Sequence, residues 1–545
     1  MRYLRTLLLP AILLSSCILS AQETLPPYHW ANDYIDYLKV QGYLPGLSFI
    51  NRPFDRPEIA RQLLTIDWGR LAHSPTDRTI VKSLYREFFP EMRQLGRSEK
   101  ARWRSLLKKA AEFLQLEIYN RSPAPDIKTG GFGETGLNYR GDSGKQFGDV
   151  AFHTQFGMFW KNQLTFYNNF KVFNRADSNY IGKEFRGLFG FVEQGYVSVH
   201  KKWIQAKFGR DFLQLGPGRS GQLLISDNSR PFDLYHVRVG GQVLQFSFWG
   251  IMLNKRTLKD DRLRTLAVAA NRYLNGHRFS LNLKNRVFIG LSEVIVYGGP
   301  ERTWELGFMN PFGIYYLHNV NLEPGASNGN VLYNLEWDLY LLPRLEIYGE
   351  FLLDDFQIDK KVPGDLEPNE LGFLGGLRWA NPLNLSHSVL DAEYVQIRNR
   401  TYNVSSSDWE KYLHRNEVIG YFAGNNLERL EGGFTYWLRP DFRVRVFSTF
   451  TRQGEGSVAG EFNQDYLNFT VAEGYSEPFP FGIVERRFRL GLSAFFKPHP
   501  LGHIGLEIYW DDVANYRHTA GRDFSEVTAR VSLWLQWSSF RQWRN

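Results

Sequence analysis

The chain has 545 residues, a length that suits one very large β architecture with a small companion or about three average domains. Aromatic residues make up 16% of the chain, and its net charge is +8. Because a transmembrane barrel needs aromatic girdles at both membrane interfaces, this composition favours a barrel over several soluble domains. The single cysteine, Cys17, excludes a disulfide framework and a cysteine-based metal site in the mature chain.

Residues 1–21 have the pattern of a secretory signal peptide, in which two arginines precede an apolar core and small residues. We expect cleavage after Ala21. The alternative is a lipobox, which would make Cys17 a lipidated N-terminus. No apolar run of 18 or more residues follows, so we expect no membrane-spanning helix. A secreted chain with alternating aromatic strands indicates the bacterial outer membrane.

Residues 22–120 are predicted to form a small helical domain in the periplasm. Asp55 is predicted to cap a helix that has Pro57 in its first turn. Residues 76–109 hold ten Lys or Arg against four Asp or Glu, which indicates either a solvated helix face or attraction to anionic lipid or an acidic polymer. Apolar residues recur at helical spacing and either pack on each other or dock another assembly protein: Trp30, Tyr34, Tyr37, Leu38, Ile59, Leu63, Leu64, Ile80, Val81, Leu84, Tyr85, Phe88, Trp103, Leu106, Leu107, Ala110 and Phe113.

Residues 121–545 are predicted to form an outer-membrane β-barrel after a proline-containing linker at 120–125. From about Gly130 onward the apolar period is two, as in residues 345–353, where Glu346 and Glu350 alternate with apolar side chains. We predict 18 antiparallel strands, with 16 as the alternative. Residues 237–252 are predicted as one strand, and Pro343 and Pro440 are predicted to mark short turns at one end of the barrel.

Residues 208–233 interrupt the strands with a polar, glycine-rich stretch whose glycines and Pro217 suit turns. Its GPGRSGQ run resembles a phosphate-binding loop, but Gln222 and Leu223 replace the required Lys and Ser/Thr, so we predict no nucleotide site. The alternatives are a loop that binds a ligand and a loop folded into the lumen, where its charges brace the barrel. We favour bracing for most of these residues: Arg210, Asp211, Arg219, Asp227 and Asp233.

Carboxylates elsewhere raise the question of glycoside hydrolysis, which needs a pair of them. Asp354 and Asp355 end an apolar run, and Glu393 lies in a later strand. Lumen carboxylates paired with arginine are ordinary in barrels, and Arg398, Arg400, Arg445 and Arg452 lie on nearby predicted strands. The 12 histidines show no metal-binding spacing. We therefore predict a protein that is not an enzyme and that uses no cofactor.

Aromatic residues in the long loops are candidates for stacking on sugar rings. Neighbouring amides and guanidinium groups suit hydroxyls and carboxylates. The same residue types are typical of an interfacial aromatic girdle, and the sequence does not separate the two roles. The candidates are Trp409, Tyr412, Tyr421, Tyr466 and Tyr475, with His414, Arg415, Asn425 and Phe469 beside them.

The run GRDFLQLGPGRSGQLLISDNSRPFD, which begins at Gly209, resembles the Wzi-type capsule assembly proteins, as do FLLDDFQID (351–359) and AEYVQIRNRTY (392–402). The resemblance implies an outer-membrane barrel of about eighteen strands, largely occluded inside, with a small periplasmic helical bundle. The helical part departs from the best-known members. Motif positions carried over are Gly209, Arg210, Asp211, Gly216, Pro217, Gly218, Arg219, Ser220, Ser226, Asp227, Asn228, Asp354, Asp355 and Gln357.

The resemblance further implies a lectin-like, non-catalytic protein that assists assembly or surface attachment of capsular or extracellular polysaccharide. Its expected partners are that polysaccharide, outer-membrane lipid and, through the helical domain, the polysaccharide export machinery; we expect no nucleic-acid partner. The rival function is an outer-membrane porin or substrate-selective channel, and a hydrolase is third.

Overall fold

The computed structural model describes residues 23–98, 100–115, 126–140, 145–160, 164–176, 180, 182–201, 203–259, 267–322, 329–357, 361–405, 407–461 and 463–541. The predicted signal peptide, with Cys17, and the predicted linker at 120–125 lie outside these residues.

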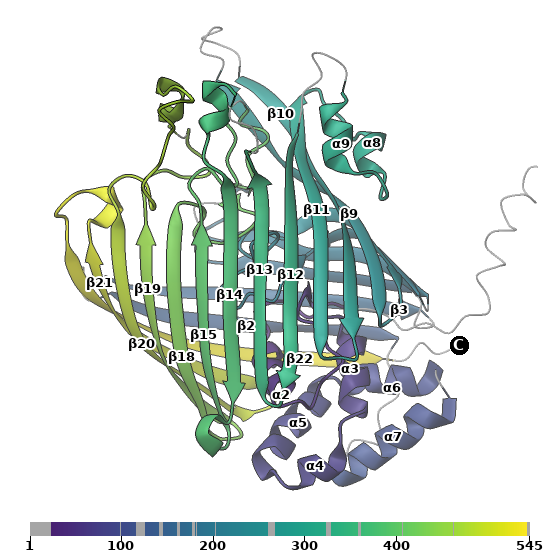
Figure 1. Ribbon diagram of the computed structural model, residues 1–545. Coiled ribbons are helices and arrows are strands. Elements are labelled where there is room, and N and C mark those ends of the chain that lie inside the picture. Colours follow the sequence, from purple (N-terminus) through teal and green to yellow (C-terminus); the bar gives the residue numbers. More distant parts are fainter. Residues whose placement is uncertain are drawn as a thin grey trace, which may run out of the picture.

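Eighteen antiparallel strands form one closed barrel (Figure 1), so the predicted number is confirmed and the alternative of 16 is wrong. Each strand pairs with the next along the chain, and β2 pairs with β22 to close the barrel, with Ile127 opposite Arg541. The strands are β2 (Ile127–Arg140), β3 (Lys145–Trp160), β4 (Leu164–Phe173), β5 (Phe189–Lys201), β6 (Ile204–Asp211), β8 (Phe232–Gly240), β9 (Leu244–Lys259), β10 (Ala267–Leu283), β11 (Val287–Pro300), β12 (Asn330–Leu342), β13 (Leu345–Asp355), β14 (Glu370–Ala380), β15 (Ser388–Ile397), β18 (Leu427–Arg439), β19 (Phe442–Gln453), β20 (Glu485–His499), β21 (Gly502–Ala514) and β22 (Phe524–Arg541).

Side chains along these strands alternate between the outer wall, which faces lipid, and the lumen. In β13, Ile347 and Phe351 are exposed on the outer wall, whereas Glu346 and Glu350 are fully buried in the lumen. The prediction of one strand over residues 237–252 is wrong, because β8 ends at Gly240 and β9 begins at Leu244. The turn has a signal in the sequence that this prediction passed over. Gly240 and Gly241 stand where the apolar positions change from Val237 and Val239 to Leu244 and Phe246.

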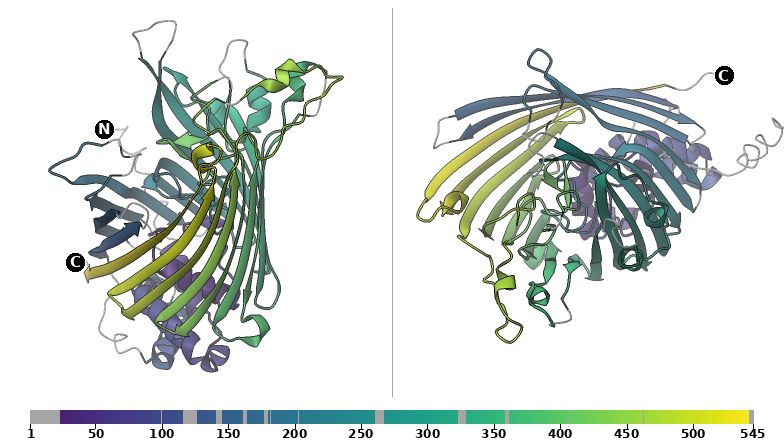
Figure 2. Two further views of the ribbon diagram at one scale, coloured as in Figure 1. Left: turned by 90° about the vertical axis from the view of Figure 1, so that its left-hand side faces the viewer. Right: turned by 90° about the horizontal axis from the view of Figure 1, so that it is seen from above.

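Residues 23–115 hold six helices within the described part of the chain, and they gather at one end of the barrel, here called the helical end (Figure 2). The opposite end is called the loop end. The helices are α2 (Ala31–Val40), α3 (Arg56–Leu64), α4 (Trp68–Ala72), α5 (Pro75–Glu87), α6 (Phe89–Ser98) and α7 (Lys100–Phe113). None of the helices in the described residues has the length and apolar character that spanning a membrane requires.

A side-chain cap is present at the start of α5 but absent at the start of α3. Ser74 accepts a hydrogen bond from the Asp77 amide at the start of α5, and Pro75 follows it. Asp55 stands at the start of α3, but its carboxylate makes no cap there, so the capping prediction is wrong. It contacts Arg238 and accepts from Gln205 at 3.2 Å, both on the barrel wall. The Asp55 carboxylate therefore pairs with Arg238 in the lumen instead of accepting a hydrogen bond from the first turn of α3.

Helix α2 joins the helices to the inner barrel wall. The Tyr34 and Tyr37 rings lie 4.9 and 5.2 Å from the Trp437 ring on β18. Two further residues, Asn51 and Arg52, form the short strand β1 (Asn51–Arg52), which pairs with β7 (Gln214–Leu215) inside the barrel. The helical segment and the loop that holds β7 therefore pack together as one unit.

Candidate functional site

Two chain segments fold into the lumen and together form what we call the plug: residues 212–231 and residues 407–421. The second segment holds a small hairpin of β16 (Leu413–His414) and β17 (Glu417–Val418). Plug residues share one apolar cluster with the inner wall of β8 to β15: Leu213, Leu215, Leu223, Leu224, Ile225, Tyr412, Leu413, Val418, Ile419 and Tyr421 from the plug, with Trp249, Leu274, Val294, Leu332, Tyr348, Leu352, Leu374 and Val395 from the wall.

Arg219 ties the plug to both the helical segment and the wall. Its Nη1 lies 3.1 Å from Asp36 Oδ2 on α2, and its Nη2 pairs with Glu346 on β13. Its guanidinium carbon stands 4.1 Å from the centre of the Phe49 ring. Burial alone lowers the pKa of the Arg219 guanidinium, but Glu346 and Asp36 more than offset this and raise the pKa well above its ordinary value.

The glycines of the same loop allow its backbone to approach Glu350 on β13. The Gly218 amide donates to Glu350 Oε1 at 3.0 Å, and the Leu223 amide donates to Oε2 at 2.7 Å. A Cβ at Gly218 would lie inside van der Waals contact of the Gly221 carbonyl oxygen. Gly216 has a φ of +124°, and a Cβ there would collide with the Glu350 carboxylate. The buried Pro217 lies between these glycines.

The plug also binds a second carboxylate of the barrel wall, that of Glu393 on β15. The Arg219 and Ser220 amides donate to Glu393 at 2.8 and 3.0 Å, and the Ser220 hydroxyl contacts the same carboxylate. The Ser220 hydroxyl also lies 2.9 Å from the Tyr421 hydroxyl. Glu393 is thus held by two backbone amides and a hydroxyl of the plug.

The remaining motif residues lie in three separate places. Arg210 pairs with Asp233 at 2.7 Å on the outer side of the barrel wall, whereas the fully buried Asp211 pairs with Lys207 and accepts from Thr24 at 2.8 Å. Residues 226–228 bind β17 and its neighbour: the Ser226 amide donates to the Ile419 carbonyl at 2.9 Å and Asn228 Nδ2 to the Val418 carbonyl at 3.0 Å, while Asp227 is exposed.

The motif positions of the β13 segment lie at the loop end of that strand. Asp354 accepts a hydrogen bond from the Tyr402 amide at 2.6 Å, and Asp355 accepts one from Gln357 Nε2 at 3.0 Å. Asp354 and Glu393 therefore make backbone contacts of their own and do not meet in one described hydrogen-bonding group. Glu393 accepts from the plug, and Asp354 accepts from the segment after β15.

The aromatic candidates divide by burial. Tyr412 and Tyr421 are fully buried, and Tyr466 is nearly so. The Tyr412 ring stacks on Tyr402 at 5.5 Å inside the barrel. Trp409 and Tyr475 are half-buried, and the backbone carbonyl of Trp409 accepts from Arg272 at 2.7 Å.

One aromatic group reaches the surface of the loop end. The Tyr475 ring lies 5.2 Å from that of Phe469 and 6.4 Å from that of Tyr466. Phe469 is exposed. Beneath these rings, Arg400 donates to both oxygens of Glu477 at 2.8 and 3.0 Å. We call Phe469, Tyr475, Arg400 and Glu477 the rim cluster.

A polar cavity of about 550 Å³ occupies the side of the lumen that the plug leaves open. It lies between α2 and the wall of β15 and β18 to β22, and its lining alternates in charge: Asp36, Arg219, Arg378, Asp391, Glu431 and Arg445 are among its residues. Arg445 pairs with Asp391 at 2.8 Å and with Glu431 at 3.3 Å. The cavity is therefore lined by charged side chains, whereas the cluster of plug residues packed against the wall of β8 to β15 is apolar.

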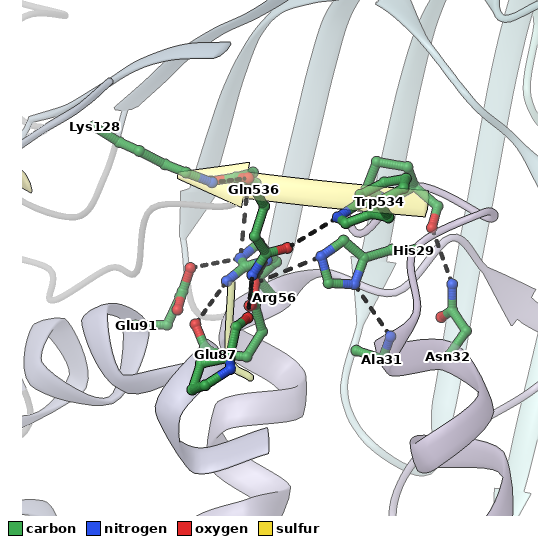
Figure 3. Close-up of polar contacts among 12 residues, drawn as sticks. His29, Ala31, Asn32, Arg56, Glu87, Glu91, Lys128, Trp534 and Gln536 are labelled. Carbon is green, nitrogen blue, oxygen red and sulfur yellow. Dashed lines mark hydrogen bonds and ion pairs between the residues drawn. The ribbon is translucent and has the colours of Figure 1, made fainter. Parts of the chain in front are cut away.

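The helical segment contacts the helical end of the barrel wall through a buried polar network (Figure 3). Arg56 lies 2.9 Å from Glu87 and 2.6 Å from Glu91, and Gln536 on β22 donates to Glu87 at 3.1 Å. Burial lowers the pKa of His29, 3.6 Å from Glu87, to about 3. Burial raises the pKa of Glu87, but Arg56 more than offsets this and brings it to about 2. Sequence reasoning missed this network, because its members follow no shared period.

A model of the family described as "Capsule assembly protein Wzi" matches residues 139–498. Among solved structures, the Escherichia coli outer-membrane protein Wzi, described as a carbohydrate-binding β-barrel involved in group 1 capsule assembly, is 13% identical with a TM-score of 0.59. That likeness covers 95% of this chain and 99% of Wzi.

The outer-membrane protein OprD of Pseudomonas aeruginosa is 9% identical with a TM-score of 0.43, over 76% of this chain and 95% of OprD. A comparison with curated proteins finds no match. The family model covers well over half of the chain. The chain therefore belongs to the Wzi capsule assembly family of outer-membrane β-barrel proteins.

Proposed function

We propose that this protein is a lectin-like, non-catalytic component that assists the assembly or surface attachment of capsular or extracellular polysaccharide. One observation carries the proposal: the loop at residues 208–233, which bears the family resemblance, is built into a packed plug instead of lining a pore. The description of E. coli Wzi as a carbohydrate-binding barrel supports the same role. The carboxylates suited to hydrolysis hold backbone amides, which favours a binding role over catalysis.

The rim cluster is the proposed contact for polysaccharide. It lies at the loop end, away from the helices, and exposes the ring of Phe469 next to the half-buried ring of Tyr475. Aromatic faces stack on the apolar faces of sugar rings. The ion pair of Arg400 with Glu477 fixes the polar floor of the cluster, so its aromatic rings are held in place before a ligand arrives.

The helical end is the proposed periplasmic side, where the export machinery is available as a partner. Most apolar positions of the helices are used in packing, since Ile59, Leu63 and Ile80 are fully buried in one core. The exposed face of α7 instead carries basic residues such as Lys108 and Lys109. A partner at this end would therefore meet charge more than apolar surface.

Deletion of the gene in a strain that makes the polymer tests the proposal. We expect the ratio of cell-bound to shed polysaccharide to fall, and an unchanged ratio would contradict the proposed role. Purified protein incubated with the polymer should leave its chain length unchanged, whereas shortening would reveal a hydrolase.

The polar cavity beside the plug favours a channel as the second candidate function. Conductance across a planar lipid bilayer separates the two candidates. The plugged barrel should show brief or no openings. A steady open channel in the intact protein would support the channel and count against a static plug.

A further inference from the structure

The loop between β11 and β12 lies on the outside of the barrel rather than over its mouth (Figure 1). It holds two short helices, α8 (Leu306–Met309) and α9 (Tyr315–Val320). On β10, Arg272 points into the lumen, where it donates to the Leu413 carbonyl of the plug at 2.9 Å. Tyr273 is the next residue and points outward. It belongs to the cluster that packs against Phe308 of the loop, so the loop covers outward-facing positions.

The loop seals a polar pair on the outer wall. His277 of β10 and Glu293 of β11 face outward and lie 3.1 Å apart, and both are largely buried. The Tyr316 amide of α9 and the Tyr333 hydroxyl of β12 each donate to Glu293 at 2.9 Å. The Tyr315 ring lies 4.6 Å from the His277 ring. The loop thus supplies both a hydrogen bond and an aromatic cover to the pair.

The position of this pair along the strands places it at membrane depth. His277 is six residues from Leu283, where β10 ends at the helical end. At the usual rise and tilt of barrel strands, six residues correspond to about 15 Å along the membrane normal. The apolar band of such barrels is roughly 25 Å tall. Without the loop, an ionisable pair would face hydrocarbon.

The outer face of the same loop is apolar. From Leu306 to Val320 the sequence contains no Lys, Arg, Asp or Glu. Leu306 is 83% exposed and Phe312 is 80% exposed. Ile314, Leu317 and Val320 are also exposed. So large an apolar patch on a loop calls for a partner.

The patch continues the lipid-facing wall of the barrel. The Phe312 ring stacks on Phe246 of β9 at 5.4 Å, and Phe246 lies 4.7 Å from Phe279 of β10, which is exposed on the outer wall. Asn319 anchors the far side of the loop by two hydrogen bonds to Gly329, at 3.0 and 2.8 Å. The loop is therefore fixed against a surface that is already in lipid.

We propose that residues 306–320 form a strap embedded in the outer leaflet of the membrane, with the acyl chains of lipid as its partner. Its inner face covers the pair of His277 and Glu293, and its outer face contacts hydrocarbon through Leu306, Phe312 and Leu317. The strap acts as a lipid contact distinct from the strands and from the rim cluster, and it does not depend on polysaccharide binding.

Nitroxide labels at single cysteines test the strap in dimyristoyl phosphatidylcholine vesicles, in the Cys17→Ser background. Labels at Phe312→Cys and Leu317→Cys should be accessible to oxygen and shielded from a water-soluble nickel chelate. Leu291→Cys, 52% exposed on the strand β11, is the lipid reference, and Leu467→Cys, 48% exposed in a loop, is the water reference. Val320→Cys replaces any strap variant that does not give the heat-shifted band of a folded barrel.

Two results would overturn the proposal. Nickel accessibility equal to that at residue 467 would place the strap in water, and shielding from both reagents with dipolar broadening between labels would identify a second copy of the chain as the partner. As an independent measure, Leu317→Arg should reduce the fraction that folds into vesicles several-fold, whereas Leu467→Arg should not. Equal yields for these two variants would also contradict the strap.

Discussion

Arg219 of the plug and Asp36 of helix α2 lie 3.1 Å apart, although 183 residues separate them in the chain. The same guanidinium pairs with the fully buried Glu346 of the barrel wall. One side chain therefore joins the helical segment, the plug and the wall. Its loss would leave the fully buried Glu346 with only its longer pairing to Arg378, at 3.4 Å.

We predict that Arg219→Ala destabilises the barrel by about 1–3 kcal/mol, because the buried Glu346 loses a hydrogen-bonded cation and keeps only Arg378, 3.4 Å away. The midpoint of the heat-induced mobility shift should fall, and bilayer conductance should rise. Binding of polysaccharide should change less. Weaker glycan binding with unchanged heat stability and conductance would show that Arg219 contacts the ligand instead.

Arg210→Ala is the matched control for that variant. Arg210 belongs to the same family motif and also pairs with an aspartate, but Asp233 is more than half exposed. Solvent-exposed ion pairs contribute at most about 1 kcal/mol, so this variant should remain close to the parent in heat stability. Equal losses for both variants would mean that the motif as a whole, and not the buried pair, sets stability.

Gly218→Ala should lower stability by about 1–3 kcal/mol or prevent folding, because the new methyl group meets the Gly221 carbonyl and lies 2.9 Å from both Glu350 and Leu374. Gly241→Ala is the control, since no atom lies within 4 Å of its added Cβ. Denaturant titration of the two purified variants measures the difference. Similar midpoints would show that the plug loop yields to overpacking.

Phe469→Ala should weaken polysaccharide binding several-fold and leave heat stability unchanged, because its exposed ring is the proposed stacking surface. Leu467→Ala, an exposed apolar residue two positions away, controls for a general loss of surface area. Calorimetric titration with purified polymer compares them. If both variants bind as the parent does, the polysaccharide contact lies elsewhere on the loop end.

The attachment of the helical segment should weaken on acidification. The pKa of His29 is about 3 in the folded protein and 6.5 ordinarily, so the unfolded state binds more protons between these values and stability falls as the pH drops from about 6.5. The pKa of Glu87, about 2 against 4.5, adds stability that is present above 4.5 and is lost as the pH falls through 2. Both contributions have the same sign.

Protease resistance of the helical segment, measured from pH 7 to pH 3, checks this expectation. His29→Asn, whose amide oxygen can accept the Ala31 amide as His29 Nδ1 does at 3.2 Å, should flatten the upper part of the pH profile. The exposed His73→Asn should leave the profile as it is in the parent. A His29→Asn profile identical to that of the parent would assign the pH dependence to other groups.

The barrel could be predicted because a strand between lipid and a wet lumen must alternate, and Glu346 and Glu350 show that alternation directly. The turn between β8 and β9 could also have been predicted, since Gly240 and Gly241 precede a change of phase in the apolar pattern from Val239 to Leu244. The strap could not, because its helices have four and six residues, too few to display a helical period.

The loop aromatics show what local sequence leaves undecided. Tyr412 and Tyr475 both stand in polar surroundings in the sequence, yet one is fully buried on Tyr402 and the other lies at the surface beside Phe469. Their burial depends on where two distant loops fold. Asp55 is similar: its capping position is visible in the sequence, but the partner that removes it from the cap, Arg238, is 183 residues away.

The pairing of β1 with β7 gives the molecule a mechanical path from the helical segment through the plug to the barrel wall. Asn51 pairs with Leu215, whose amide donates to the Ile225 carbonyl at 2.9 Å, and Ser226 continues to Ile419 at 2.9 Å. The hairpin of β16 and β17 then reaches Arg272 of the wall. A force applied to the helices would be carried by these hydrogen bonds through the plug to the barrel wall.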